Sequence, residues 1–400
     1  MRVSTELIFD RGVTAIQDRQ SDLLATQQQL STGRRIITPA DDPIAAAQAL
    51  QLTQADETNS RFRVNRDYAQ GQLSLAEASI AQAVDVVQAV REQAVAAGNG
   101  SYTDGDLKSV ADDVAGRLQQ LLAIANGTDA QGHYLFSGFQ GATQPFVVAP
   151  GGAVQYLGDD GARMVQAGAA RQIALNVSGA AVFQRIPTGN GVFTWAAGAA
   201  NSGGGVIGPG SVTNPALVTG HNYRITFAAA GGVTTYDVVD TTTSTTVLAA
   251  QPYSGGPASI GFDGLQVNIE GSPANGDTFT VAPSTDQSVF TTIQNLVTAL
   301  RSGGGTGLDN ALGSAITNLD QALNQALAQR ADVGTRLREI DASNAAGEEF
   351  GVQYQSARSK LQDVDYAKAV SDLSREQLSL QAAQQSFVKV TQLSLFDYLP

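Results

Sequence analysis

The chain has 400 residues, which suits two or three domains, and no cysteine, which excludes disulfides and cysteine-based zinc or thiol sites. Its formal net charge of −13 argues against sequence-independent binding to nucleic acid or anionic membrane. Charges at Glu6, Asp10 and Arg11 exclude a signal-peptide core, and no apolar run approaches the ~20 residues that cross a bilayer.

The N-terminal third is predicted to be helical. A first helix covers about residues 4–32 and ends at Gly33. Asp42 is a suitable N-cap and Pro43 a suitable first residue for a second helix that runs to about residue 97. A third helix begins near Asp104. The heptad-like apolar stripe of the second helix comprises Leu52, Phe62, Ala69, Leu73, Ala76, Ile80, Ala83, Val87, Val90 and Ala94.

From about residue 134 the apolar period changes from helical to alternating. Strands are predicted around residues 145–148, 154–157 and 173–175, and charge nearly vanishes between about 187 and 284. Alternation on both sides of Gly231-Gly232 predicts a hairpin. The strand of Leu265, Val267 and Ile269 is expected to pair with the strand of Phe279 and Val281. A disordered tether is the less favoured alternative for this stretch.

Helix returns at about residue 288 and, after the Gly303–Gly307 break, from about 309 to 360. This long helix has its own stripe, comprising Ile316, Leu319, Leu323, Ala326, Val333, Leu337 and Ile340. A last helix follows Asp363-Val364-Asp365. The two outermost helices have narrow stripes interrupted by glutamines. These are Val13, Ile16, Gln20, Leu23, Gln27 and Leu30 in the first, and Val370, Leu373, Gln377, Leu380, Gln384 and Phe387 in the last.

These patterns predict a multidomain α+β protein in which the N- and C-terminal arms form an antiparallel long-helix bundle or coiled coil. Residues 1–40 with 361–400 are expected to form a terminal helical assembly domain. Residues 41–186 with 285–360 are expected to form a long-helix rod domain, with a small β region at about 134–186. Residues 187–284 are expected to form an inserted all-β domain, either sandwich or barrel-like.

No motif predicts a catalytic, cofactor or metal site, so we do not expect an enzyme. The run 203–208 matches G-x-G-x-x-G, but Pro209 and Gly210 follow where a dinucleotide site needs a helix. His133 and His221 are far apart in sequence and are interpreted as turn or surface residues. Asp41 and Asp42 head a helix, and are interpreted as capping residues rather than an acid pair.

Several of these segments resemble bacterial flagellins and their relatives. The similar segments are Leu30-Ser31-Thr32-Gly33-Arg34-Arg35-Ile36, Asp41-Asp42-Pro43-Ile44-Ala45-Ala46, Val90-Arg91-Glu92-Gln93-Ala94-Val95 and Asp363-Val364-Asp365-Tyr366-Ala367. Within that family, the opening Met1-Arg2-Val3-Ser4-Thr5, the stretch 330–337 and the ending Ser394-Leu395-Phe396-Asp397-Tyr398-Leu399 resemble the junction proteins between hook and filament. The resemblance covers both helical arms, and the insert departs from it in length.

The resemblance implies an extracellular structural protein of the flagellum, exported by the flagellar type III apparatus without a cleaved signal peptide. It also implies assembly between hook-associated protein 1 and flagellin, contacts with further copies of itself, and a dedicated export chaperone. Neither nucleic-acid binding nor membrane insertion is expected. The alternatives are a filament flagellin of the same fold, and an adhesin-like binding module on a helical stalk.

The outer stripes lead to a hypothesis about assembly. A two-helix pair with polar interruptions is marginal alone, so residues about 1–40 and 361–400 are expected to order when neighbouring subunits complete their packing. Candidate assembly residues are Leu23, Leu30, Leu373, Leu380, Phe387, Leu395 and Phe396. Their alternative role is packing between the two arms. Gln20, Gln27, Gln377 and Gln384 are candidates for setting the register of packing, and the alternative is that they face solvent.

Overall fold

The computed structural model describes residues 5–392. The chain divides into two compact units. One consists of residues 1–64 and 343–400, described over 5–64 and 343–392, and the other of residues 65–342. The boundary lies inside two long helices, whereas the sequence places it at the connectors near residues 40 and 361. The expected three-part division stays a prediction.

The helix bounds agree closely with those expected. In chain order, the helices are α1 (Thr5–Thr32), α2 (Pro43–Ala97), α3 (Asp104–Ala125), α4 (Gly179–Phe183), α5 (Val289–Arg301), α6 (Thr306–Gln362) and α7 (Tyr366–Gln392). Local signals explain the agreement. Thr103 and Asp106 form a capping box at the start of α3, and Ser288 caps α5 through the Thr291 N–H. The short α4 has no periodic signal and was not expected.

One apolar core holds the helices of the second unit together. Its buried residues on α2 include Ala69, Leu73, Ile80, Ala83, Val87, Val90 and Ala94, and those on α6 include Leu319, Ala326, Val333 and Ile340. Helices α3 and α5 contribute further buried residues. One window of α2 is apolar and long enough to cross a membrane by composition. The burial of its apolar stripe in this core accounts for that hydropathy.

Two short hairpins and one two-stranded ladder adjoin this helical core. The hairpins are β1 (Phe146–Val148) with β2 (Val154–Tyr156), and β3 (Met164–Gly168) with β4 (Arg171–Ala174). The ladder pairs β5 (Ile186–Pro187) with β14 (Asp286–Gln287), on the two sides of the insert. Asn126, at the end of α3, exchanges two 2.9 Å hydrogen bonds with the backbone of Phe146. The Phe146 ring also contacts Phe183 and Phe290, so the hairpin joins the bundle core.

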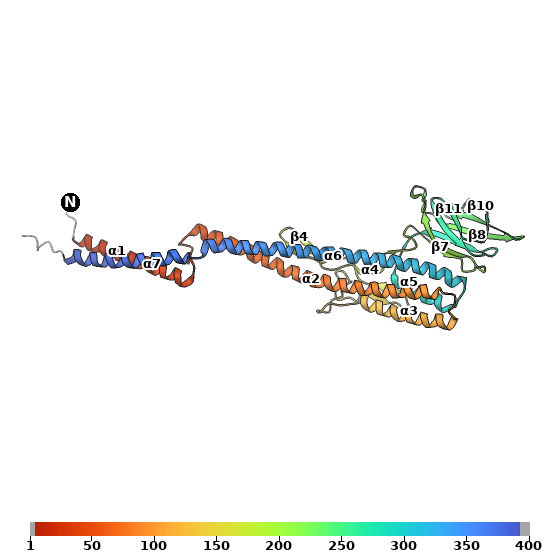
Figure 1. The fold of residues 1–400 in the computed structure, drawn as a ribbon, viewed down its shortest axis with the longest axis horizontal. Helices are drawn as coiled ribbons and strands as arrows, with labels where there is room; N and C mark the ends of the chain where they lie inside the picture. The colour runs from red at the N-terminus through yellow and green to blue at the C-terminus, as the bar shows by residue number, and fades with distance from the viewer. Residues whose placement is uncertain (1–4, 393–400) are drawn as a thin grey trace, which may run out of the picture. The chain divides into compact units, whose positions relative to one another are not determined.

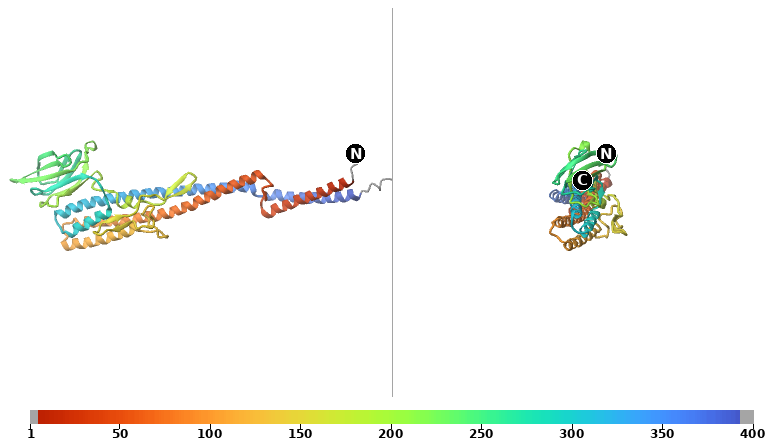
Figure 2. Two further views of the ribbon diagram at one scale, coloured as in Figure 1. Left: turned by 180° about the vertical axis from the view of Figure 1, so that it is seen from behind. Right: turned by 90° about the vertical axis from the view of Figure 1, so that its right-hand side faces the viewer.

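The inserted region is an antiparallel β domain with its own core. Its strands are β6 (Phe193–Ala197), β7 (Val206–Val212), β8 (Tyr223–Ala230), β9 (Val233–Asp240), β10 (Thr245–Tyr253), β11 (Ala258–Phe262), β12 (Leu265–Glu270) and β13 (Thr278–Pro283), with a 3₁₀ turn at Pro215–Leu217. They form a five-stranded sheet ordered β10-β9-β8-β13-β6 and a three-stranded sheet ordered β11-β12-β7 (Figures 1 and 2). The hairpin predicted at Gly231-Gly232 is confirmed, and both glycines have positive φ.

The expected pairing of β12 with β13 is wrong. β12 pairs with β11 and β7, whereas β13 pairs with β8 and β6. Alternate residues of both strands, such as Val267 and Phe279, are buried in one common core. Alternation therefore identified the buried face of each strand, but it carries no information about the neighbouring strand.

The insert is fixed to α6 by a buried asparagine. Asn310 Oδ1 accepts a hydrogen bond from the Ile207 N–H at 2.8 Å, and its Nδ2 donates to the Gly205 carbonyl at 3.1 Å. These two backbone groups lie at the start of β7. The Asn310 side chain therefore provides a hydrogen-bond partner for both of them where the insert adjoins α6.

Replacing Asn310 with Leu should destabilise the insert by about 1–3 kcal/mol, because both backbone groups lose a buried partner. Urea unfolding followed by the fluorescence of Trp195, which is the chain's single tryptophan and lies in β6, measures this. Asn324→Leu is the matched control, since Asn324 is exposed on the same helix. Equal unfolding midpoints for the two variants would show that Asn310 does not hold the insert.

Candidate functional site

Helices α1 and α7 form an antiparallel pair in the first unit (Figures 1 and 2). At one end, the Phe387 ring lies over Gly12, and the rings of Phe9 and Phe387 are 5.2 Å apart. At the other end, Arg34 and Asp363 form an antiparallel backbone bridge.

The seam between α1 and α7 is narrow. Thr26 and Ala369 are buried, and the other seam residues are partly buried. On α7 the seam positions are Ala369, Leu373, Glu376, Leu380, Ala383 and Phe387, which alternate steps of four and three residues. This is the spacing of a two-helix coiled coil. Because several seam residues are small, the two helices approach closely but bury little apolar area.

All four glutamines at the interrupted heptad positions are exposed. The seam uses Thr26 in place of Gln27, and Glu376 and Ala383 in place of Gln377 and Gln384. Where a polar residue stands next to a small one, the sequence alone does not show which of the two lies in the seam. The small residue is used here because it lets the two helices come closer together. Within this chain the glutamines face solvent, and any register-setting role concerns contacts with other chains and stays a prediction.

Glu376 is the one acidic residue at these seam positions of α7. It is partly buried, and its Oε2 is fully buried with no hydrogen-bond partner among the described residues. Leaving a charged group's oxygen without a partner costs free energy that the thin seam must offset. The α1–α7 pair therefore combines limited apolar burial with an unfavourable polar group.

Backbone hydrogen bonds join residues 33–35, after α1, to residues 362–364, where α6 ends. We call this contact the joint. The Arg35 N–H donates to the Gln362 carbonyl at 2.6 Å, and the Val364 N–H donates to the Gly33 carbonyl at 3.0 Å. The Arg35 guanidinium adds a bond to the Leu361 carbonyl at 2.8 Å. The flagellin-like segments around residues 30–36 and 363–367 thus meet here, although more than 300 residues separate them.

Asp41 and Asp42 organise the connector that enters α2. Asp42 Oδ1 accepts from the Ala45 N–H at 3.0 Å, and Pro43 is the first residue of α2, which is the arrangement of a helix N-cap. Asp41 accepts from the Thr38 and Ile37 N–H groups at 2.7 and 2.9 Å. These backbone hydrogen bonds lower the pKa of both carboxyl groups, with Arg35 adding to the effect on Asp42.

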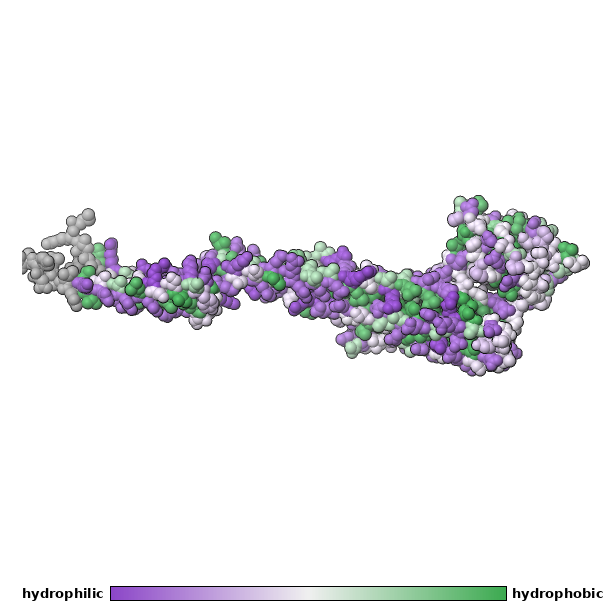
Figure 3. Space-filling model, viewed as in Figure 1, coloured by the Kyte–Doolittle hydropathy of each residue, from purple (hydrophilic) through white to green (hydrophobic). Residues whose placement is uncertain are grey.

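The predicted assembly residues are only partly available on the arm surface. Leu23, Leu30, Leu373, Leu380 and Phe387 are partly buried at the seam, while Leu395 and Phe396 lie outside the described residues. Exposed apolar residues of α1 and α7 include Leu24, Val370, Leu378, Val388 and Val390. Leu24 and Leu378 are 63% and 68% exposed. Figure 3 shows hydrophobic residues scattered among hydrophilic ones along this part of the chain. Val370 belongs to the predicted stripe of the last helix, whereas the others stand beside the apolar stripes and were not predicted from the sequence.

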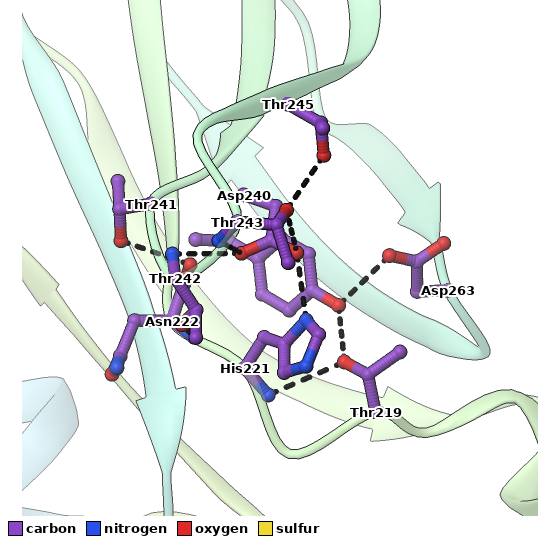
Figure 4. Close-up of polar contacts among 10 residues, drawn as sticks. Thr219, His221, Asn222, Asp240, Thr241, Thr242, Thr243, Thr245 and Asp263 are labelled. Atoms are coloured by element: carbon purple, nitrogen blue, oxygen red, sulfur yellow. Dashed lines mark hydrogen bonds and ion pairs between the residues drawn. The ribbon is translucent and has the colours of Figure 1, made fainter.

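The two histidines lie in separate places, and each has an aspartate partner. His133 Nδ1 is 3.6 Å from Asp129 Oδ2, and His221 Nδ1 is 2.7 Å from Asp240 Oδ2. Asp240 is buried and also accepts from the Thr242 and Thr243 N–H groups and the Thr243 hydroxyl, so it closes the β9–β10 turn (Figure 4). Burial alone would raise its pKa, but the hydrogen bonds from Thr243 and His221 outweigh this and lower the pKa to about 2.

Tyr223 belongs to the same polar cluster. Its hydroxyl donates to Asp263 at 2.8 Å and lies 2.6 Å from Thr219 Oγ1 (Figure 4). Burial, assisted by Asp263, raises the pKa of Tyr223 to about 12. Among residues 5–392, no three His, Asp or Glu side chains are grouped so as to hold a metal ion. The glycine run at 203–208 leads into strand β7. The cluster therefore serves the turns of the insert.

Comparison with known proteins assigns the two arms and the insert to different family models. The bacterial flagellin N-terminal helical region matches residues 3–141, and the bacterial flagellin C-terminal helical region matches residues 316–399. The D2-like domain of flagellar hook-associated protein 1 matches residues 196–283. The phase 1 flagellin of Salmonella naestved is 33% identical, but over only 116 residues, or 28% of this chain and 22% of that protein.

The full-length similarity is to another flagellar protein. Flagellar hook-associated protein 3 of Salmonella typhimurium is 28% identical over 397 residues, 99% of each chain. The crystal structure of flagellar hook-associated protein 3 from Legionella pneumophila is 30% identical with a TM-score of 0.74, over 78% of this chain and 98% of that one. The chain belongs to the flagellar hook-associated protein 3 family. Xanthomonas campestris FlgL is similarly close, with 30% identity and a TM-score of 0.71 over 77% of this chain and 99% of that one.

Membership of the hook-associated protein 3 family makes the chain a structural component of the bacterial flagellum. It confirms the flagellin-like resemblance of the arms and the α+β fold. The relatives are structural proteins of the flagellum.

Gly12→Ala should weaken the α1–α7 pair. A methyl group at Gly12 would lie 2.5 Å from Phe387 Cδ2, so the seam must open although alanine raises helix propensity by about 1 kcal/mol. Hydrogen exchange of the purified chain should show faster exchange along α1 and α7. Gly71→Ala in α2 is the control, since nothing lies within 4 Å of that position. Slower exchange of the arm in Gly12→Ala would contradict the close seam.

The insert should lose stability as the pH falls from about 4 to 2. Asp240 has an ordinary pKa of 3.8 when unfolded and about 2 when folded, so its contribution is complete above the first value and is lost toward the second. Urea unfolding monitored by Trp195 at successive pH values measures this. Asp240→Asn should be less stable at neutral pH and should depend less on pH in that window. Identical pH profiles would show that Asp240 is not the group responsible.

Proposed function

We propose that the chain forms the junction between hook and filament, as a short zone of copies between hook-associated protein 1 and flagellin. A relative of 29% identity from Legionella pneumophila is described as a flagellar junction protein. The occurrence of two flagellin arms and a hook-associated protein 1-like domain in one chain supports a position between those two proteins. A bulk filament flagellin is less favoured, since similarity to flagellins is restricted to a fraction of the chain.

The thin α1–α7 seam supports assembly through the arms. Identical subunits in a tube need head-to-tail contacts between different surfaces. Leu24, Val370 and Leu378 offer apolar surface outside the seam, and the partly buried Leu23, Leu30, Leu373, Leu380 and Phe387 gain burial if neighbours cover them. The unpartnered Glu376 oxygen supports an arm that is marginal in the monomer and gains order in the assembly. Leu395 and Phe396 remain candidates for the same interface.

Export belongs to the same proposal. The chain would leave the cell through the flagellar type III channel, with a chaperone covering the C-terminal helix α7 until assembly. A marginal arm suits this route, because a narrow channel requires segments that unfold at low cost.

Cells of the source bacterium that lack this gene should make hooks without filaments and shed flagellin monomers into the medium. Electron microscopy of the cells and immunoblotting of the medium measure both effects. The wild-type gene on a plasmid is the control and should restore filaments. Normal filaments in the deletion strain would refute the junction role. Unaided growth of long filaments from the purified chain would favour a bulk flagellin instead.

A further inference from the structure

A polar cavity of about 450 Å³ lies at the joint of the first unit. Its lining comprises Arg34 from the connector, Thr53 from α2, Gln355, Arg358, Ser359 and Gln362 from α6, and Asp363. All of these residues belong to the unit formed by residues 1–64 and 343–400. The cavity adjoins the backbone bonds that hold the joint, so its walls are fixed by the pairing of residues 33–35 with 362–364.

Two cations in this cavity have no partner in the described chain. The backbone of Arg34 is held by the bridge to Asp363, but its guanidinium makes no hydrogen bond or ion pair with residues 5–392. The same holds for the Arg358 guanidinium among the described residues. The neighbouring Arg35 differs, since it binds Asp42 and the Leu361 carbonyl. Asp363 is engaged by the Ser359 hydroxyl. The cavity therefore contains two guanidinium groups without partners among the described residues, and one carboxylate, that of Asp363, which already accepts a hydrogen bond.

A carboxylate is the ligand that this arrangement fits. Guanidinium groups bind carboxylates through paired hydrogen bonds of fixed geometry, and such bonds are among the stronger polar contacts in proteins. The chain carries 37 acidic against 24 basic residues, so acidic side chains are abundant on its surface. On the same unit, Asp18 and Glu57 are exposed and make no ion pair within the described residues. Both are available to a neighbouring molecule.

We infer that the Arg34–Arg358 cavity binds an acidic side chain from a helical arm of a second copy of this chain. This inference rests on the proposed assembly function, because head-to-tail packing brings different surfaces of identical subunits together. The contact fixes the axial position of one subunit relative to its neighbour, because two cations and one carboxylate meet in only one alignment. The exposed leucines and valines of the arm would allow the two subunits to shift along each other. The ion pair thus selects the packing that the apolar contacts stabilise.

The double variant Arg34→Glu with Arg358→Glu tests the inference in the deletion strain. We expect at least about a tenfold loss of filamented cells, since the loss of one pair worth 1.4 kcal/mol already changes an equilibrium tenfold. The purified double variant Arg34→Gln with Arg358→Gln, which adds no carboxylate beside Asp363, should keep the thermal unfolding midpoint of the wild type, because neither side chain has a partner to lose, and should also lose filaments in the deletion strain. Arg63→Glu with Lys360→Glu is the control matched for charge, since Arg63 and Lys360 are exposed in the same unit and do not line the cavity.

A charge swap identifies the occupant. Asp18→Lys, Glu57→Lys and the corresponding changes at Asp10, Glu348 and Glu349 are each added to the double variant, and restored filaments in one combination are expected. Wild-type assembly by the double variant would overturn the inference. Restoration only by a swap in flagellin or in hook-associated protein 1 would also overturn it, as would failure of every swap. The wild-type gene tests the junction role in the same strain, so failure of the two ideas is distinguishable.

Discussion

The arm structure depends on one constraint, which is that the first and last helices of the chain must pair with each other. The hydrogen bond from Arg35 to Leu361 joins residues 326 positions apart. The entropic cost of closing so long a loop grows only slowly with its length. The α1–α7 seam buries little apolar area, so by itself it would offset little of that cost. The core of the second unit removes most of that cost, because it fixes α2 and α6, which run on to the two sides of the joint.

Packing strength therefore differs between the two units for a physical reason. In the second unit α2, α3, α5 and α6 share one core with large apolar residues such as Leu73, Ile80 and Phe290 fully buried. In the first unit α1 and α7 bury mainly small or partly covered residues and enclose the unpartnered Glu376 oxygen. A subunit that must remain single until it reaches its place needs its assembly surface to be weakly satisfied alone. The terminal pair, which we propose as the assembly surface, is weakly packed in this sense, whereas the second unit has a continuous core.

Sequence reasoning recovered those features that local chemistry determines. The bounds of α2 and α3 follow from Asp42-Pro43 and Thr103, and the β8–β9 turn follows from Gly231-Gly232. It failed where the answer depends on distant residues. Alternation could not tell that β12 and β13 belong to different sheets, and a heptad pattern could not choose Thr26 over Gln27. The joint was invisible because its bonds join backbone groups, so no side-chain pattern marks the pairing of residues 33–35 with 362–364.

The separation of the two cores explains how one chain can resemble two flagellar proteins. The insert has a core of its own, built from residues such as Trp195, Tyr223 and Phe279, and none of these belongs to the core of the helical bundle. Its attachments include the β5–β14 ladder, the groups around Asn310, and hydrogen bonds of the Gly189 backbone with Asn318 and Gln321 of α6. The buried side chains of the insert core and of the bundle core are nevertheless separate sets. The flagellin matches cover residues 3–141 and 316–399, and the match to the hook-associated protein 1 domain covers 196–283 within the insert, so each family resemblance falls on a different part of the chain.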